Sequence, residues 1–295
     1  MVAYIADIDK DEVRSDYLVT AKMKRIWQKE IEILLLIDKI CKKHNIKYWV
    51  EYGSLLGAVR HHGFIPWDDD LDIAMMRPDY ELFKQVAPAE LSAPFSLENA
   101  YNSSFITAFS KIRNAETTAI EFPDKPDINQ GIFVDIFPYD DMPDGSPEKE
   151  RIFQIQRELW CCIINPSEIK KAVREKWQLT LKSSLLEKIL SLPLTERMHE
   201  FEEFNLNHFG HSAYLNFITG AFFKTPHVKR EWYAELVLVP FEEITVPIPV
   251  NYHEALQARY HDYMVPIRGL NSHTNLFLDP DVPYEYYLKN GLPNK

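Results

Sequence analysis

Apolar residues recur at helical spacing between residues 21 and 44 and predict the clearest helix of the chain. One stripe of this helix carries Met23, Trp27, Glu30, Leu34, Ile37 and Cys41. Lysine and glutamate fill the positions between them, so the pattern is typical of a surface helix whose apolar face packs on a core.

A strand, a turn and a short helix are expected next. Residues 46–52 alternate between the two faces of a predicted strand. Gly53 and Ser54 break that strand and open a helix to about Arg60, with Gly63 as its expected end.

The same patterns predict the remaining elements. Strands are expected at residues 71–75, 95–98, 105–113, 132–137, 235–239 and 243–248, and helices at 78–86, across 148–207 with interruptions near Pro166 and Pro193, and at 252–263. A turn-rich link after Pro138 separates the strand-rich part from the helical part. The order predicts one α/β (α+β) domain with a helical insertion or lobe.

Composition places the chain among ordinary globular proteins. Its 295 residues are 46% hydrophobic and 26% charged, which suits a folded core and argues against disorder. The net charge of −11 disfavours a nucleic-acid binder, which usually shows a basic stripe. The three cysteines, two of them adjacent, give neither a disulfide framework nor a zinc spacing and favour a reducing compartment.

The start of the chain and its apolar runs bear on localisation. The first residues are acidic and lack the basic start and apolar run of a signal peptide. The longest strongly apolar run, residues 33–37, is far too short for a transmembrane segment. A soluble, cytoplasmic protein is expected, and peripheral membrane contact is compatible with the sequence.

Two acids fall on a predicted strand, at Asp70 and Asp72. Such pairs carry little information alone, because 44 acids among 295 residues give roughly six or seven acid-x-acid pairs by chance. These two alternate with apolar residues, so both carboxylates should leave one face and could converge on one or two hard cations. Asp68 and Asp69 extend the acidic run, and the sequence leaves open whether they bind metal or shape a loop.

A third acid, Asp135, lies within the apolar run of residues 132–137. A carboxylate buried there without a partner would be costly, so a metal or another cation is expected beside it. The three acids and the Gly-Ser turn are typical of phosphoryl transfer, in which Mg²⁺ or Mn²⁺ neutralises the transferring phosphate and the leaving oxygen.

Several groups could hold a phosphate. The backbone amides of Gly53 and Ser54 open a helix and therefore suit an anion. Arg60, His61 and His62 could add contacts, although a role in capping the helix end is an equal alternative.

Other candidates also have a second explanation. Lys111 and Arg113 alternate on a predicted strand, where phosphate contact and a solvated edge strand are equal alternatives. Four aromatics could enclose an ammonium group by cation–π attraction, although such residues more often belong to a core: Trp49, Tyr52, Phe64 and Trp67.

Four blocks of sequence carry a family resemblance. They are YGSLLGAVRHHGFIPWDDDLDIAM at residues 52–75, FSKIRNAETT at 109–118, GIFVDIFPYDDMPD at 131–144, and VPFEEITVPIP followed by YHDYM between 239 and 264. In these blocks the chain resembles the LicD family of phosphocholine transferases, from about residue 24 to 275. That family is similar to proteins with the nucleotidyltransferase fold and to the fukutin-related glycan phosphotransferases. This similarity implies a catalytic core built on a mixed sheet.

The resemblance implies transfer of phosphocholine from CDP-choline to a sugar hydroxyl, with CMP leaving. The acceptor would be a cell-surface glycan precursor such as teichoic acid or lipooligosaccharide, and it could be lipid-linked. By position, Asp70 and Asp72 would bind the metal. Asp135 would be the third ligand and could take the proton from the acceptor hydroxyl, while Gly53 and Ser54 would hold the phosphates.

The resemblance also implies the limits of the domain. A transferase domain is expected at residues 22–275, with a catalytic core at about 44–145, a helical region at about 148–230, a C-terminal segment at about 235–275, and flanking segments at 1–21 and 276–295. The chain departs from the family at His261, where glycine is usual. If the backbone there has a positive φ, a histidine is strained.

Three alternatives stay open. Transfer of a nucleoside monophosphate from an NTP would use the same fold and acids, and a CDP-alditol could replace CDP-choline. A silent glycan- or nucleotide-binding protein is the non-enzymatic alternative. The presence of all three acids, Asp70, Asp72 and Asp135, favours an enzyme.

Overall fold

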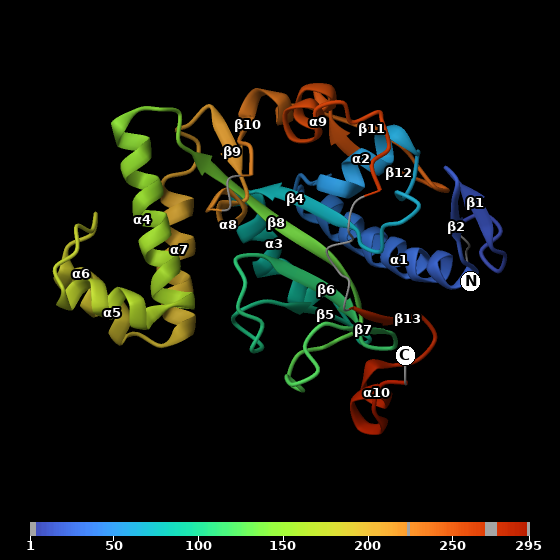
Figure 1. The fold of residues 1–295 in the computed structure, drawn as a ribbon, viewed down its shortest axis with the longest axis horizontal. Coiled ribbons are helices and arrows are strands. Elements are labelled where there is room, and N and C mark those ends of the chain that lie inside the picture. Colours follow the sequence, from blue (N-terminus) through green and yellow to red (C-terminus); the bar gives the residue numbers. More distant parts are fainter. Residues whose placement is uncertain (1–3, 223–224, 269–275, 294–295) are drawn as a thin grey trace. The chain divides into compact units, whose positions relative to one another are not determined.

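The computed structural model describes residues 4–222, 225–268 and 276–293. The chain divides into two compact units, one formed by Met1–Phe137 and Trp232–Lys295 and the other by Pro138–Glu231 (Figure 1). In the described part of the chain, no helix is long and apolar enough to cross a membrane. The transferase-domain limits stay a prediction, and residues 269–275 at its expected end lie outside the described residues.

The main sheet of the first unit has the strand order β3, β4, β8, β6, β5. These strands are β3 (Trp49–Val50), β4 (Asp72–Met76), β5 (Phe95–Glu98), β6 (Ser110–Asn114) and β8 (Ile132–Met142). Figure 1 labels β4, β8, β6 and β5 of this sheet. β3 pairs antiparallel with β4, and β6 pairs antiparallel with both β5 and β8. The two strands expected to carry acids, β4 and β8, are therefore neighbours in the middle of a mixed α/β core.

Helix α1 (Ala21–His44) confirms the predicted amphipathic helix. Thr20 caps its start by accepting a hydrogen bond from the amide of Met23. Asn45 ends it with a φ of 54°, a left-handed conformation that asparagine tolerates. Met23 packs partly buried against the core. The other apolar residues of the stripe are buried in the core, as the spacing predicts: Trp27, Leu34, Ile37 and Cys41.

Helix α2 (Tyr52–Arg60) follows β3 and confirms the predicted end near Arg60, but its C-cap is His61 and not Gly63. His62, with a φ of 54°, takes the left-handed conformation that was expected of glycine. Gly63 is required for a different reason, because a Cβ there would lie 2.2 Å from Oε1 of Glu242. The close approach of another segment therefore explains this glycine.

Some predicted strands are shorter in the structure. β3 covers two residues of the expected 46–52, since Tyr52 has a φ of 50° and already belongs to α2. β6 begins at Ser110 and not at residue 105, because the hydroxyls of Ser103 and Thr107 bond to nearby backbone groups in place of a strand partner.

Two helices contact the main sheet and each other. α1 contacts β6, and α3 (Arg77–Glu90) contacts both β4 and β5. Pro78 lies in the first turn of α3, as predicted. The amides of the first turn have no hydrogen-bond partner within the helix, so a proline, which lacks the amide hydrogen, costs no hydrogen bond there.

The remaining elements of the first unit are short. They are the paired strands β1 (Glu12–Arg14) and β2 (Tyr17–Val19), β7 (Thr118–Ile120) with β13 (Phe277–Asp279), β11 (Leu236–Phe241) with β12 (Ile244–Pro249), and the helices α9 (Tyr252–Tyr260) and α10 (Tyr284–Asn290). β11, β12 and α9 confirm the elements predicted after residue 235. At the end of α9, His261 has φ and ψ of 55° and −110°, so a positive φ is present where the family usually has glycine.

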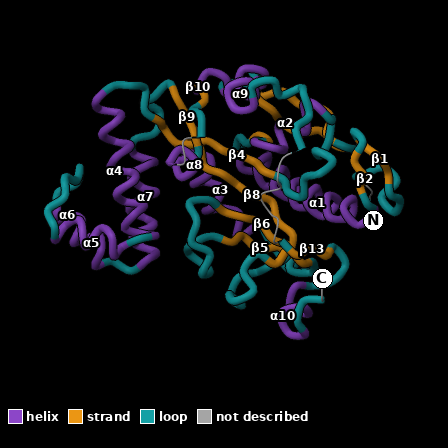
Figure 2. Tube along the Cα trace, in the orientation of Figure 1, coloured by secondary structure: helices purple, strands orange, loops and turns teal. Residues whose placement is uncertain are grey.

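The second unit is mostly helical, as expected for residues 148–207 (Figure 2). It contains α4 (Pro147–Ile164), α5 (Pro166–Arg174), α6 (Ser183–Ser191), α7 (Leu194–Asn207), β9 (Tyr214–Asn216), α8 (Ile218–Phe222) and β10 (Val228–Lys229), and the short helix η1 (Arg230–Tyr233) begins at its end. Pro166 and Pro193 lie at helix starts, which explains the predicted interruptions. The end of β8 pairs with β9, so β8 continues past the predicted residue 137.

Candidate active site

Charged side chains line up across three neighbouring strands of the first unit. Lys111 on β6 lies directly opposite Asp135 on β8, and β4, which begins at Asp72, is the next strand. Opposite residues in an antiparallel pair project from the same face. Lys111 Nζ accordingly lies 3.1 Å from Asp135 Oδ1. Asp135 and Lys111 both influence the pKa of the Asp72 carboxyl, so the three groups lie within electrostatic reach of one another.

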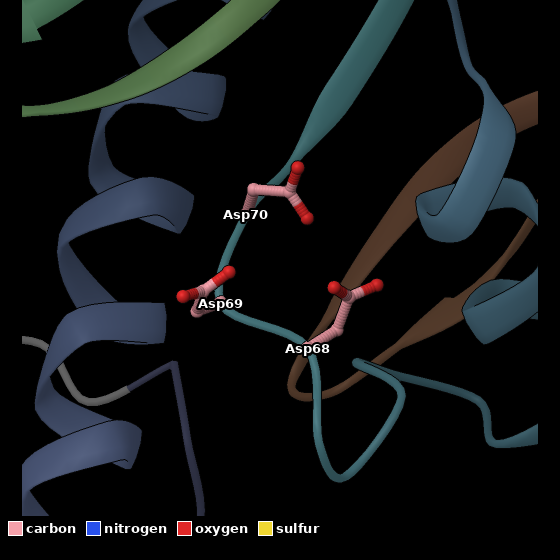
Figure 3. A group of neighbouring side chains, drawn as sticks. All are labelled: Asp68, Asp69 and Asp70. Atoms are coloured by element: carbon pink, nitrogen blue, oxygen red, sulfur yellow. The ribbon is translucent and has the colours of Figure 1, made fainter. Parts of the chain in front are cut away.

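The acidic loop, residues 68–70, leads into β4 (Figure 3). Asp70 lies in this loop and not on the strand, so the expectation that Asp70 and Asp72 both project from one strand is wrong for Asp70. Carboxylate oxygens of Asp68, Asp69 and Asp70 lie within 4.8 Å of one another. Figure 3 shows the Asp68 and Asp70 carboxyls facing each other, and a hydrogen bond joins them. Asp69 is turned toward α1.

The start of α2 lies against these acids. A Cβ on Gly53 would lie 2.7 Å from Oδ2 of Asp68, so only glycine leaves room for that carboxyl. Ser54 Oγ accepts a hydrogen bond of 2.8 Å from the amide of Asp72. Because the first amides of a helix have no intrahelical partner, Gly53 and Ser54 offer donors to an anion directly beside the acids.

Burial and mutual repulsion hold these carboxyls in an unusual state. Burial, and next the Asp70 charge, raise the pKa of Asp68 to about 8 and the pKa of Asp72 well above its usual range. Burial raises the pKa of Asp135 to about 6 although Lys111 opposes the shift. Oδ1 of Asp135 has no aligned hydrogen bond. A hard divalent cation would remove this repulsion. Among the described residues, the cluster of carboxylate oxygens within 4.8 Å of one another is that of the acidic loop, so binding of a metal by Asp70, Asp72 and Asp135 stays a prediction.

Glu30 on α1 also faces the acids, and the sequence prediction missed it. Its side chain is 2% exposed, and Oε2 has no hydrogen-bond partner among the described residues. Burial, followed by Asp70, Asp69 and Asp68, raises the pKa of Glu30 well above its usual range. The sequence did contain a signal for Glu30, because it is an acid at a core-facing position of an otherwise apolar stripe. Helical spacing alone does not show that the acidic loop faces that position.

Comparison with known proteins bears directly on this site. The LicD/FKTN/FKRP nucleotidyltransferase domain family matches residues 45–161, which include β4, the acidic loop and β8. The lipopolysaccharide cholinephosphotransferase LicD of Haemophilus influenzae is 25% identical over 252 residues, covering 82% of this chain and 93% of that protein. Residues 45–161 of the chain carry a LicD-family domain. The enzyme class of the chain is accordingly that of a phosphotransferase.

Two shorter matches extend the comparison. The human ribitol 5-phosphate transferase FKRP is 47% identical over 46 residues, covering 16% of this chain and 9% of FKRP. An uncharacterised protein of Rickettsia prowazekii is 52% identical over 66 residues, covering 22% of this chain and 25% of that protein. These local identities are about twice that of the full-length LicD relative, so similarity is concentrated in short segments.

Lys111 has a structural position that the sequence left open. It is 2% exposed, and β6 lies between β5 and β8, so the alternative of a solvated edge strand is wrong. Its ammonium pairs with Asp135 and, at 3.2 Å, with Glu121. Arg113 also pairs with Glu121 and donates to the carbonyl of Gly131. Contact of Lys111 with a phosphate stays a prediction, whereas its contact with Asp135 is direct.

The structure separates Arg60 from the Gly-Ser turn of the LicD domain. Arg60 lies at the last position of α2 and Gly53 at the second. Seven residues of helix put their backbones about 10 Å apart. Arg60 donates to the carbonyl of Tyr263 at 2.7 Å and to the ring of His61 at 2.9 Å. His61 is half-buried and His62 is exposed beside it.

The four candidate aromatics divide into two pairs. Trp49 and Phe64 are 1% and 2% exposed and belong to the core. Tyr52 and Trp67 are half-buried. The guanidinium of Arg259 lies 4.8 Å from the ring centre of Tyr52, and that of Arg268 lies 5.8 Å from the ring centre of Trp67. Cations of the chain itself therefore lie over both half-buried rings.

Replacing Glu30 with glutamine is expected to stabilise the metal-free protein. Glutamine keeps the shape of the side chain but cannot ionise beside the aspartates, so a source of repulsion disappears. Thermal unfolding in EDTA at pH 8 should show a higher melting temperature for Glu30→Gln. Glu32→Gln, on the same helix and half-buried, is the matched control. A lower melting temperature for Glu30→Gln would contradict the placement of Glu30 beside the acids.

His61 is expected to make the protein less stable in mild acid. Burial, and next the charge of Arg60, lower the pKa of His61 from 6.5 to about 4. Between these values the unfolded chain binds the extra proton and the folded protein does not, so the free energy of unfolding falls as pH falls. Urea unfolding at pH 7 and pH 5 should show a smaller loss for His61→Gln than for the wild type. Equal losses would count against this role.

Proposed function

We propose that this protein transfers phosphocholine from CDP-choline to a sugar hydroxyl of a cell-surface glycan precursor and releases CMP. The observation that carries the proposal is the row of Lys111, Asp135 and Asp72 on adjacent strands, with the acidic loop against the start of α2. The Haemophilus influenzae relative, a lipopolysaccharide cholinephosphotransferase, supports this group transfer and a lipopolysaccharide-type acceptor such as lipooligosaccharide. Teichoic acid is the alternative acceptor. Free cysteines are compatible with a cytoplasmic setting.

The proposed reaction divides the work among the chain's own residues. Asp70, Asp72 and Asp135 would hold Mg²⁺ or Mn²⁺, which when bound neutralises charge on the phosphate and on the leaving CMP. The amides at the start of α2, Gly53 and Ser54, would orient the diphosphate.

Bond making and proton transfer follow from this arrangement. The acceptor hydroxyl oxygen would form the new bond to the choline-bearing phosphorus, and the bond from that phosphorus to the CMP oxygen would break. Asp135 would take the hydroxyl proton, and Lys111, which faces it across the strands, would hold its carboxylate in position. Binding CDP-choline and acceptor side by side makes the attack effectively intramolecular.

The test is a transfer assay with the purified chain. CDP-choline, Mg²⁺ and a lipooligosaccharide or teichoic-acid acceptor should yield CMP and a choline-bearing glycan, and EDTA should stop the reaction. Mn²⁺ in place of Mg²⁺ tests the choice of metal. No CMP with either metal and either acceptor would overturn the proposal.

A second donor is favoured by one comparison. The match to FKRP, a ribitol 5-phosphate transferase, makes a CDP-alditol such as CDP-ribitol the rival to CDP-choline. Both donors release CMP, so the product glycan must be analysed by mass. Transfer from an NTP would instead release pyrophosphate, and a pyrophosphate assay separates that reaction from the other two.

A further inference from the structure

A cavity of about 470 Å³ lies in the first unit, apart from the row of acids on the sheet. Its wall combines the hairpin of β1 and β2, the C-terminal end of α2 and the turn between β11 and β12. The polar lining residues are Arg14, Ser15, Arg60, His61, His62, Glu242 and Glu243. Pro66, two residues before the acidic loop, also lines it, so the cavity borders the proposed reaction site.

One of the two arginines in this cavity is fully matched by acids. Arg14 pairs with Glu12 and, at 2.6 Å, with Glu242. Glu242 also accepts a hydrogen bond from the amide of Phe64. These ion pairs and this hydrogen bond join the segments that form the wall of the cavity.

Arg60, the second arginine of the cavity, forms no such ion pair among the described residues. It is half-buried, and its hydrogen bonds go to a histidine ring and to the carbonyl of Tyr263. Within residues 4–222, 225–268 and 276–293, no carboxylate forms an ion pair with it. Burial alone lowers the pKa of Arg60, with no acid opposing the shift. A half-buried guanidinium without a counter-charge is costly, and a bound anion would supply that charge.

The charges around His61 have the same sign. Arg60, Arg14 and His62 all lower the pKa of His61, and no acid acts against them. Glu243 is exposed. Because Arg14 is paired with two glutamates, Arg60 is the positive charge of this cavity that no ion pair within the described part of the chain offsets. Its guanidinium would attract a phosphate or a carboxylate.

We propose that this cavity binds an anionic group of the acceptor glycan, a phosphate or a carboxylate, with Arg60 as its main charge partner. The donor diphosphate is a poor occupant, because Gly53 and Arg60 stand at opposite ends of α2, about 10 Å apart. A glycan that carries a charged substituent near its reacting hydroxyl could reach both places. The inference rests on the proposed transferase function for the identity of the acceptor, but binding of the anion does not depend on turnover.

Binding of an anion can be measured directly. Inorganic phosphate is titrated into EDTA-treated protein by calorimetry, using the wild type, Arg60→Gln and Arg25→Gln. Arg25 lies on α1 outside the cavity and pairs with Asp281, so its replacement removes the same charge elsewhere. Phosphate should bind at least tenfold more weakly to Arg60→Gln and equally to Arg25→Gln. No saturable binding to the wild type, or equal affinity for Arg60→Gln, would overturn the inference.

Steady-state kinetics then separate acceptor from donor. With a phosphate-bearing acceptor, Arg60→Gln should raise the acceptor KM at least tenfold and leave the donor KM within twofold. A rise in the donor KM alone would assign the anion to CDP-choline and overturn the inference. Absence of CMP release by the wild type would instead refute the proposed function, while the phosphate titration still decides the cavity.

Discussion

Replacing Asp72 with asparagine is expected to lower turnover on the order of 10²–10³-fold and to leave the fold intact. Asparagine keeps the shape of the side chain but loses the charge that a divalent cation needs. Asp72 is buried at the start of β4, between Asp70 in the acidic loop and Asp135 on the next strand. Its removal should therefore also relieve repulsion in the metal-free protein. CMP release measures the first effect, and melting temperature in EDTA measures the second.

Two comparisons make the Asp72 result decisive. Mg²⁺ should raise the melting temperature of the wild type and have a much smaller effect on Asp72→Asn, because ligand binding stabilises only a protein that binds it. Asp124→Asn, an exposed acid of the same unit, should behave like the wild type. Full activity of Asp72→Asn would refute the metal-site assignment.

Replacing Lys111 with methionine is expected to reduce the free energy of unfolding by about 3–5 kcal/mol. Lys111 is buried between Asp135 and Glu121, and its ammonium lies 3.1 and 3.2 Å from their carboxylates. Methionine fills similar space, but it leaves the buried carboxylate of Asp135 without its positive partner and leaves Glu121 paired with Arg113 alone. Urea unfolding of the metal-free protein at pH 7 measures the loss.

A second substitution tests the cause of that loss. Lys111→Met combined with Asp135→Asn should recover part of the stability, since the second change removes the buried charge that lost its partner. Lys39→Met, on the exposed face of α1, should cost much less. A loss below 1 kcal/mol for Lys111→Met would show that the buried ion pairs are not what stabilises this part of the sheet.

Local sequence patterns were sufficient to predict the elements whose conformation depends mainly on residues nearby in the sequence. α1 was predicted from its apolar stripe alone, and the cap at Thr20 and the basic last turn in the structure agree with that stripe. Asp135 was predicted to face a cation because an acid in an apolar run is costly wherever the run packs. The structure supplies that cation as Lys111 and leaves one oxygen of Asp135 without an aligned hydrogen bond.

Other features depend on strand order and long-range contacts, which spacing does not encode. Lys111 looked equally suited to an edge strand, because nothing local shows that β6 lies between β5 and β8. Glu30 was placed on the correct helix face, but the acidic loop opposite it is about forty residues away in sequence. The pairing of β7 with β13 joins segments on either side of the helical unit, and such short strands carry little pattern.

The two hydrogen bonds that join α2 to β4 tie their movements together. The amide of Glu51 donates to the carbonyl of Asp72, and the amide of Asp72 donates to Ser54. These two bonds close the segment between Glu51 and Asp72 into a loop, so a shift of the Gly53-Ser54 turn would also move Asp72, a proposed metal ligand. Substitutions inside this loop that alter the choice of donor headgroup would therefore also disturb the proposed metal site. Substitutions that change donor specificity should instead occur in the residues around this loop, which can vary while the two hydrogen bonds are kept.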